Sequence, residues 1–179
     1  MNLFKKPSRH IAVVLFLTCC LTHAQESVPH DVNRSGTDFV REFYGWYIKT
    51  AITSNEGWLQ SVLKQKTFAL APGLRRQLQL YARVPDNPDG EIEGLDFDPF
   101  LNAQDNADRY EFGELQRKRA TYWVPVYGIW SGRRHSVPDI VAELELNQGR
   151  WSFVNFHYGN KRSDENLIKT LKRFIENPR

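Results

Sequence analysis

The sequence predicts an α+β domain in which helices come first and an antiparallel sheet follows. Before residue 85, apolar residues recur at the three- and four-residue spacing that is typical of helices. Between residues 110 and 158, short runs rich in aromatic and β-branched residues alternate with turn residues, as in strands joined by hairpins. Because 41% of the 179 residues are hydrophobic, the chain can form a packed core, which we predict as one domain over 37–179.

Residues 1–24 have the features of an export signal. The apolar run over 11–21 is too short for a bilayer span, which needs about 20 residues, but it suits a signal peptide. It follows three basic residues, Lys5, Lys6 and Arg9. We predict cleavage after Ala24 and a periplasmic protein that has no transmembrane segment after processing.

Both cysteines of the chain, Cys19 and Cys20, lie inside this predicted signal. One alternative is therefore a lipid anchor at Cys20, and another is a signal that is kept as an anchor. If the chain is cut after Ala24, the mature protein holds no cysteine, which excludes a thiol nucleophile and a disulfide bond.

Three helices are expected before residue 85. We predict a flexible arm over 25–36 and then a helix over 38–52, with one apolar face that packs on a sheet. That face consists of Phe39, Val40, Phe43, Tyr44, Tyr47, Ile48 and Ala51. A shorter helix is expected around 58–63, and a third begins at Pro72, since proline fits the first turn of a helix.

Four strands and a last helix are expected after residue 109. The strand patterns cover 110–115, 121–130, 140–146 and 151–158. Pro125 predicts an edge or bulge position within its run, and the last run is apolar on both faces, as in a covered central strand. Ser163 is expected to cap the final helix, which carries apolar residues between 167 and 175.

The charges of the chain are unevenly distributed. Residues 85–114 hold ten acidic residues and one basic residue, whereas the segments on either side are basic. Without residues 1–24 the chain has 21 basic and 21 acidic residues, so it lacks the basic surplus typical of nucleic-acid binders. We predict that an acidic surface loop binds a basic cell-envelope protein through Asp86, Asp89, Glu91 and Glu93.

The stretch 96–105 is the strongest local motif, and its role is predicted to be structural. The residues to which we assign this structural role are Asp96, Asp98, Pro99, Phe100, Gln104 and Asp105. Asp98 followed by Pro99 is typical of a helix start, where the carboxylate accepts hydrogen bonds from free N–H groups. Three carboxylates around a calcium ion are the less favoured interpretation. We predict no metal site, no cofactor and no catalytic residue, since neither a Gly-x-Ser-x-Gly elbow nor a phosphate-binding glycine loop occurs.

The segment over 94–105, GLDFDPFLNAQD, resembles a motif of the YqhG-type exported bacterial family of unknown function. That family includes immunity proteins against peptidoglycan amidases delivered by the type VI secretion system. The aromatic helix over 39–47, the strand over 122–126 and the start of the last strand at 149–151 agree with the resemblance. Many relatives read Trp-x-Ile-Asp-Asp-Ile in the last strand, whereas residues 151–156 read WSFVNF, so no role of those carboxylates carries over.

The resemblance implies a cystatin-like cone, similar to nuclear-transport-factor-2-like folds, and a binding role in the periplasm. One hypothesis is therefore a protein-binding module, such as an immunity or inhibitor protein for a cell-wall amidase. The alternative is a small-molecule-binding or enzymatic cone, whose pocket would be lined by aromatic residues. These are Tyr44, Tyr47, Trp123, Tyr127, Trp151 and Phe153. A sheet filled by its own aromatic side chains would favour the first hypothesis, and an open pocket around a buried carboxylate the second.

Overall fold

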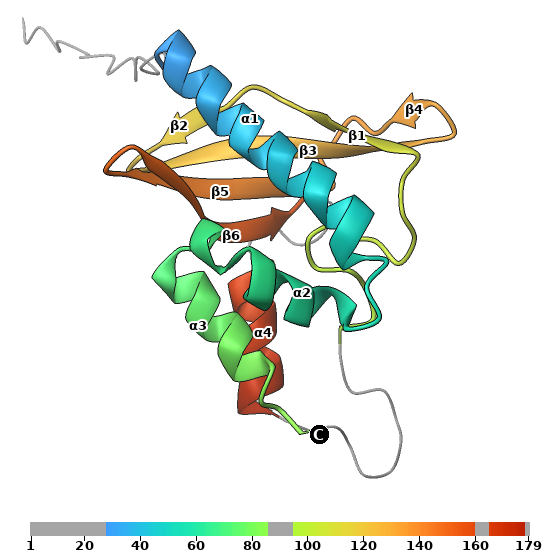
Figure 1. Ribbon diagram of the computed structural model, residues 1–179. Helices are drawn as coiled ribbons and strands as arrows, with labels where there is room; N and C mark the ends of the chain where they lie inside the picture. The colour runs from blue at the N-terminus through green and yellow to red at the C-terminus, as the bar shows by residue number, and fades with distance from the viewer. Residues whose placement is uncertain (1–27, 86–94, 160–164, 178–179) are drawn as a thin grey trace, which may run out of the picture.

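The computed structural model describes residues 28–85, 95–159 and 165–177. The fold is α+β, with helices followed by an antiparallel sheet, as the sequence predicts (Figure 1). The helical elements are α1 (His30–Trp46), η1 (Tyr47–Ala51), α2 (Gly57–Gln65), η2 (Thr67–Ala69), α3 (Pro72–Tyr81) and α4 (Leu167–Glu176). The strands are β1 (Arg109–Phe112), β2 (Gln116–Lys118), β3 (Thr121–Trp130), β4 (Arg133–Arg134), β5 (Ile140–Asn147) and β6 (Arg150–Tyr158).

The sheet has the strand order β1-β3-β5-β6, and β2 and β4 also pair with β3. All of these pairs are antiparallel. Gln148 and Gly149 join β5 to β6 as a two-residue turn in which both φ angles are positive, at 51° and 76°. Such a turn matches the right-handed twist of a hairpin, so the predicted connection at this position is confirmed.

Pro125 lies in the central strand β3, where a proline would normally interrupt the ladder. On one side β3 pairs with β1 up to Phe112 and with β2 from Gln116 onward. Pro125 falls in the gap between these partners, where its carbonyl accepts a hydrogen bond of 2.8 Å from the Gly113 N–H. The missing donor of Pro125 falls at an irregular point of the ladder, where four residue steps from Phe112 to Gln116 lie opposite three from Val126 to Trp123. The predicted bulge position is therefore confirmed.

The prediction that 151–158 is a central strand is wrong, because β6 is the last strand of the sheet. Its outer edge is covered by chain that is not part of the sheet. Leu70 forms a parallel bridge with Phe153, and Asn166 forms an antiparallel bridge with His157. The apolar run does not mean two covered faces, because a register shift opposite Glu143 and Leu144 turns both Phe153 and Phe156 to the side that packs on Phe43.

Helix α1 begins at His30, so the prediction of a flexible arm over 25–36 is wrong for residues 30–36. Contacts with distant strands hold these first turns. Gly36 packs so closely on Leu115 that a Cβ atom would overlap the leucine side chain. The Asn33 side chain accepts a hydrogen bond of 3.3 Å from the Leu115 N–H, and the Ser35 hydroxyl accepts one of 3.2 Å from the Trp151 indole. Residues 25–27 lie outside the described part of the chain.

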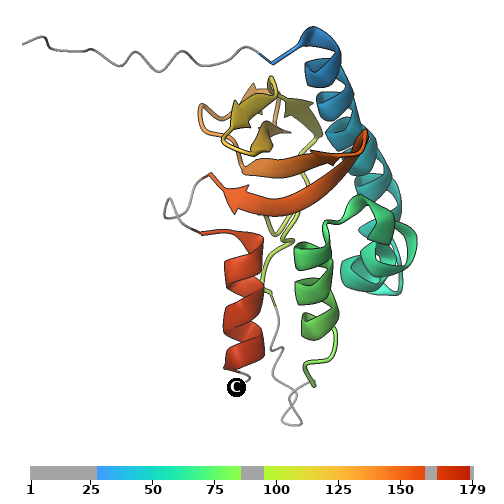
Figure 2. The same cartoon turned by 90° about the vertical axis from the view of Figure 1, so that its left-hand side faces the viewer.

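Helix α4 is capped by Asn166, whose side chain accepts a hydrogen bond of 3.0 Å from the Lys169 N–H. The predicted cap, Ser163, lies outside the described residues. The preceding strand supports the same helix end, because the Asn155 side chain accepts a hydrogen bond of 3.2 Å from the Ile168 N–H. These contacts fix α4 against β6, and Figure 2 shows α3 and α4 side by side below the sheet.

The core lies between α1 and one face of the sheet, which we call the inner face (Figure 2). Phe43 of α1 is central, with ring centroids 4.7 Å from Phe153, 5.6 Å from Phe100 and 5.6 Å from Tyr47. The largest fully buried side chains include five aromatics: Tyr44, Tyr47, Phe100, Phe153 and Phe156. Within the described ranges, no helix has both the length and the apolar character that a bilayer span requires.

Candidate functional site

The motif over 96–105 forms a turn that is hydrogen-bonded to α1 and η1. The Asp98 carboxylate accepts hydrogen bonds from the Phe100 N–H at 2.9 Å and the Leu101 N–H at 3.1 Å, so it caps the turn as predicted. No helix follows, because Asn102 adopts a φ of 54° and the Ala103 carbonyl accepts a hydrogen bond of 2.9 Å from the Asp98 N–H. The prediction of a helix start at Asp98 is therefore wrong, although its physical basis, the capping carboxylate, holds.

Two tyrosines, one from α1 and one from η1, donate hydrogen bonds to this turn. The Tyr47 hydroxyl donates a 2.7 Å hydrogen bond to the second oxygen of Asp98, and the Tyr44 hydroxyl donates one of 2.7 Å to the Phe100 carbonyl. Burial raises the pKa of Asp98, and this effect outweighs the hydrogen bonds that stabilise its charged form. Burial, followed by the nearby Asp98 charge, also raises the pKa values of both tyrosines.

The remaining motif residues support a structural role. Pro99 and Phe100 are buried, and the Phe100 ring lies 4.7 Å from the Phe156 ring. Asp96, Gln104 and Asp105 are exposed. Among the described residues, no group of three His, Cys, Asp or Glu side chains could hold a metal ion. The hydrogen bonds of Asp98 are those of a turn cap, and the turn fastens α1 to the sheet.

The four residues that we predict to bind a partner, Asp86, Asp89, Glu91 and Glu93, lie outside the described residues. The six aromatics of the alternative hypothesis do not line one pocket. Tyr44, Tyr47 and Phe153 are fully buried in the core. Trp151 packs at the inner face with its ring 5.1 Å from Tyr122, whereas Trp123 and Tyr127 lie on the opposite face, which we call the outer face.

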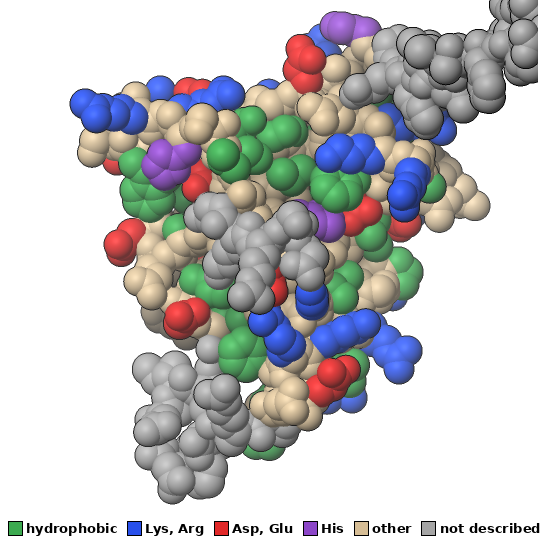
Figure 3. Space-filling model, turned by 180° about the vertical axis from the view of Figure 1, so that it is seen from behind, with side chains coloured by type: hydrophobic (Ala, Val, Ile, Leu, Met, Phe, Trp, Pro, Cys, Tyr) green, Lys and Arg blue, Asp and Glu red, His purple; other side chains and the backbone are tan. Residues whose placement is uncertain are grey.

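A ladder of polar and aromatic side chains crosses the outer face. The Lys118 ammonium lies 4.1 Å from the Trp123 ring, which stacks on the His157 ring at 4.3 Å. His157 is joined to Glu143 by a hydrogen bond of 2.8 Å, which is the main cause of the lowered pKa of Glu143. Figure 3 shows apolar, basic and histidine side chains interspersed on this side of the molecule. The ladder uses β2, β3, β5 and β6, so no local sequence pattern could have revealed it.

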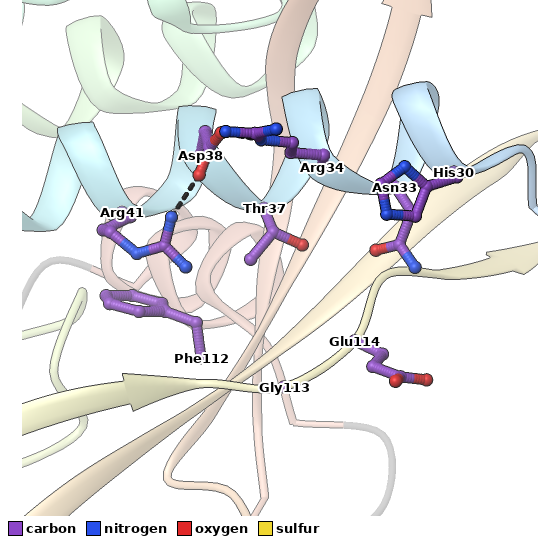
Figure 4. Close-up of a pocket in the computed structure, with 9 residues that line it drawn as sticks. All are labelled: His30, Asn33, Arg34, Thr37, Asp38, Arg41, Phe112, Gly113 and Glu114. Carbon is purple, nitrogen blue, oxygen red and sulfur yellow. Dashed lines mark hydrogen bonds and ion pairs between the residues drawn. The ribbon is translucent and has the colours of Figure 1, made fainter.

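A surface groove separates α1 from β1 and the residues that follow it (Figure 4). It consists of two hollows, with volumes of about 320 Å³ and 240 Å³, that share Arg41 and Phe112. The larger hollow extends toward His30 and Glu114, and the smaller toward Gly45 and Asp108. We call the two together the α1–β1 groove. Its walls come from the segments 30–48 and 107–114, which are far apart in the sequence, and sequence reasoning missed it.

The middle of the α1–β1 groove carries a net positive charge, from two arginines against one aspartate, and each end holds an exposed carboxylate. Asp38 forms an ion pair with Arg41 and lies 3.9 Å from Arg34. The Arg41 guanidinium also lies 5.7 Å from the centroid of the Phe112 ring. Asp108 and Glu114 are exposed at opposite ends and form no ion pair with any described residue. A ligand with positive charges at both ends would match this distribution.

Comparisons with known proteins return no matching family model, no similar curated protein and no similar solved structure.

Proposed function

We propose that the protein is an exported module of the cell envelope that binds another protein. The pattern over 1–24 supports export to the periplasm. The resemblance over 94–105 supports membership of the YqhG-type family, a cystatin-like cone, and a role as immunity or inhibitor protein for a peptidoglycan amidase. The partner is a basic envelope protein, since residues 85–114 carry ten acidic residues against one basic residue.

One observation carries this proposal. The space between α1 and the inner face is filled by the protein's own rings, because Phe43 and Phe156 each contact both Phe100 and Phe153. The hollows of the α1–β1 groove instead lie on the surface. An architecture that fills its interior and keeps an open groove along a strand favours recognition of a macromolecule over enclosure of a small one.

The alternative function, a small-molecule-binding or enzymatic cone, has one observation in its favour. Asp98 is a largely buried carboxylate whose pKa is raised, which is a common property of catalytic acids. However, its oxygens accept hydrogen bonds from two N–H groups and from Tyr47, and Asp98 does not line either hollow of the groove. A structural cap accounts for all of these contacts, so we favour the binding module.

The proposal is tested by measuring binding to candidate peptidoglycan amidases by calorimetry or interferometry. We expect a complex that weakens with increasing salt and is lost in the double variant Asp86→Lys with Glu91→Lys. The matched control is Glu42→Lys with Glu176→Lys, which makes the same change in net charge at exposed helix positions. A complex that survives the first reversal would remove the acidic segment from the proposal.

Localisation is tested independently of the partner. Cell fractionation should place the protein in the periplasm, and sequencing of its amino terminus should begin at Gln25, the residue after the predicted cut. A lipid-modified terminus at Cys20 would replace the soluble form with the anchored alternative. An intact Met1 in the cytosol would contradict export altogether.

A further inference from the structure

We propose that the α1–β1 groove binds an extended segment of the partner protein. The segment adds as a new strand to the free edge of β1 and carries basic side chains at both ends. This inference rests on the proposed function, because it assigns a binding site and a ligand chemistry to the same module.

The first argument is the free edge of β1. In the described sheet, β1 pairs on one side only, with β3. The Gly113 N–H donates a hydrogen bond to Pro125, so alternation along the strand directs the backbone groups of Arg109 and Glu111 toward β3. The N–H and C=O groups of Tyr110 and Phe112 therefore point away from the sheet. No described backbone group bonds to them there.

The second argument is the room beside this edge. An extended chain rises about 3.3 Å per residue, so the stretch from Asp108 to Glu114 matches a segment of about seven residues. On the α1 side of the groove, Gly45 has no side chain to fill the space. It is exposed, and a Cβ atom added to it would meet nothing within 4 Å. The two hollows can take side chains of the added strand. Helix and edge strand thus form the kind of groove in which strand addition gives affinity through main-chain hydrogen bonds.

The third argument is charge. Asp108 and Glu114 stand at the two ends of the groove without an ion-pair partner among the described residues. Between them, Asp38 is shared by Arg41 and Arg34, so the middle of the groove keeps one positive charge and disfavours a basic side chain there. The Arg109 guanidinium at the same edge is engaged by Glu111 at 3.3 Å. A segment with Lys or Arg at its first and last positions and uncharged residues between them fits this pattern.

The test uses a displayed library of random seven-residue peptides, panned against the full chain, with selected peptides resynthesised with blocked termini. We expect enrichment of Lys or Arg at the two end positions. Gly45→Leu, which fills the groove from the helix side, should weaken binding at least tenfold. The matched control is Gly73→Leu in α3, another exposed helical glycine with open space around it, and this variant should bind like the wild type.

Two further measurements separate strand addition from simple charge attraction. Methylation of alternate peptide nitrogens should weaken binding at least tenfold in one register and not in the other, because only one set of N–H groups faces β1. The variant Asp108→Lys with Glu114→Lys should weaken binding at least tenfold and reduce its salt dependence. Equal effects of both methylation registers would overturn the strand-addition model.

The same variants distinguish failure of this inference from failure of the proposed function. If a partner protein binds the wild type and Gly45→Leu equally well, the binding function stands and the groove assignment is wrong. Failure of the library to yield any peptide that is sensitive to Gly45→Leu would also overturn the groove assignment. If no envelope protein forms a complex with the wild type, the proposed function itself is wrong, whatever the peptides show.

Discussion

Replacing Asp98 with alanine removes three hydrogen bonds from one side chain. Two come from the N–H groups of Phe100 and Leu101, and the third comes from the Tyr47 hydroxyl. A hydrogen bond contributes about 0.5–1.5 kcal/mol net to stability, and about 1.5–3 kcal/mol when the acceptor is charged. Because Asp98 is itself desolvated, part of that gain is already offset. We therefore expect Asp98→Ala to lower the free energy of unfolding by about 3–4 kcal/mol.

Asp98→Asn is the matched variant. Its side-chain oxygen can still accept from the two N–H groups, and its amide can donate to the Tyr47 hydroxyl oxygen. The loss should therefore be below about 1.5 kcal/mol. Urea denaturation at neutral pH, followed by circular dichroism, measures both values. An Asp98→Ala loss below about 1 kcal/mol would refute the view that this carboxylate fastens the turn to α1.

The raised pKa of Asp98 gives this comparison a pH dependence of definite sign. Between the ordinary aspartate pKa of the unfolded chain and the raised pKa of the folded protein, the folded state binds more protons. Stability from this group therefore rises as the pH falls through the folded pKa, and levels off below the unfolded pKa. The wild type should gain stability relative to Asp98→Asn over that window, and a relative loss would contradict the burial argument.

Three other variants test separate parts of the structure. Phe43→Ala should lower the free energy of unfolding by about 3–5 kcal/mol in urea denaturation, because it empties the centre of the aromatic core. Gly36→Ala should lower the melting temperature at a cost of about 1–3 kcal/mol, since its Cβ atom would overlap the Leu115 side chain; a higher melting temperature would show that helix propensity dominates instead. His157→Ala should raise the pKa of Glu143 in an NMR titration, because it removes the hydrogen bond that is the main cause of its lowering.

Local sequence patterns predict which helices and strands form in this fold, but they do not predict the contacts between them. The apolar stripe of α1 and the β-rich runs of β3, β5 and β6 each contain their own periodicity, so their existence follows from the sequence. The start of α1 does not follow from a local pattern, because residues 30–36 are held by contacts with Leu115 and Trp151, which lie far along the chain. The same holds for Asp98, whose capping role is local but whose burial under Tyr47 is not.

The candidate site was less predictable than the fold for the same physical reason. The α1–β1 groove depends on Gly45 facing a strand more than sixty residues later, and neither segment carries a motif of its own. The sequence shows the acidic composition of residues 85–114, but it predicts binding at Asp86, Asp89, Glu91 and Glu93 and not at Asp108 or Glu114. The positions of Asp108 and Glu114 at opposite ends of one groove required the three-dimensional arrangement.

The unequal margins of the sheet limit how copies of the protein can associate. At the β6 margin, the Ala71 N–H donates a hydrogen bond of 2.9 Å to the Phe153 carbonyl, and the Asn166 bridge occupies His157. The strands β1 and β2 lie on the opposite side of β3, whereas β4, which has only two residues, pairs with β3 on the β5 side, since Ile129 pairs with both Arg109 and Arg134. Joining through main-chain pairing can therefore continue in only one direction from each molecule. Such growth stops at two copies, so the fold resists polymerising into fibres by strand-to-strand stacking.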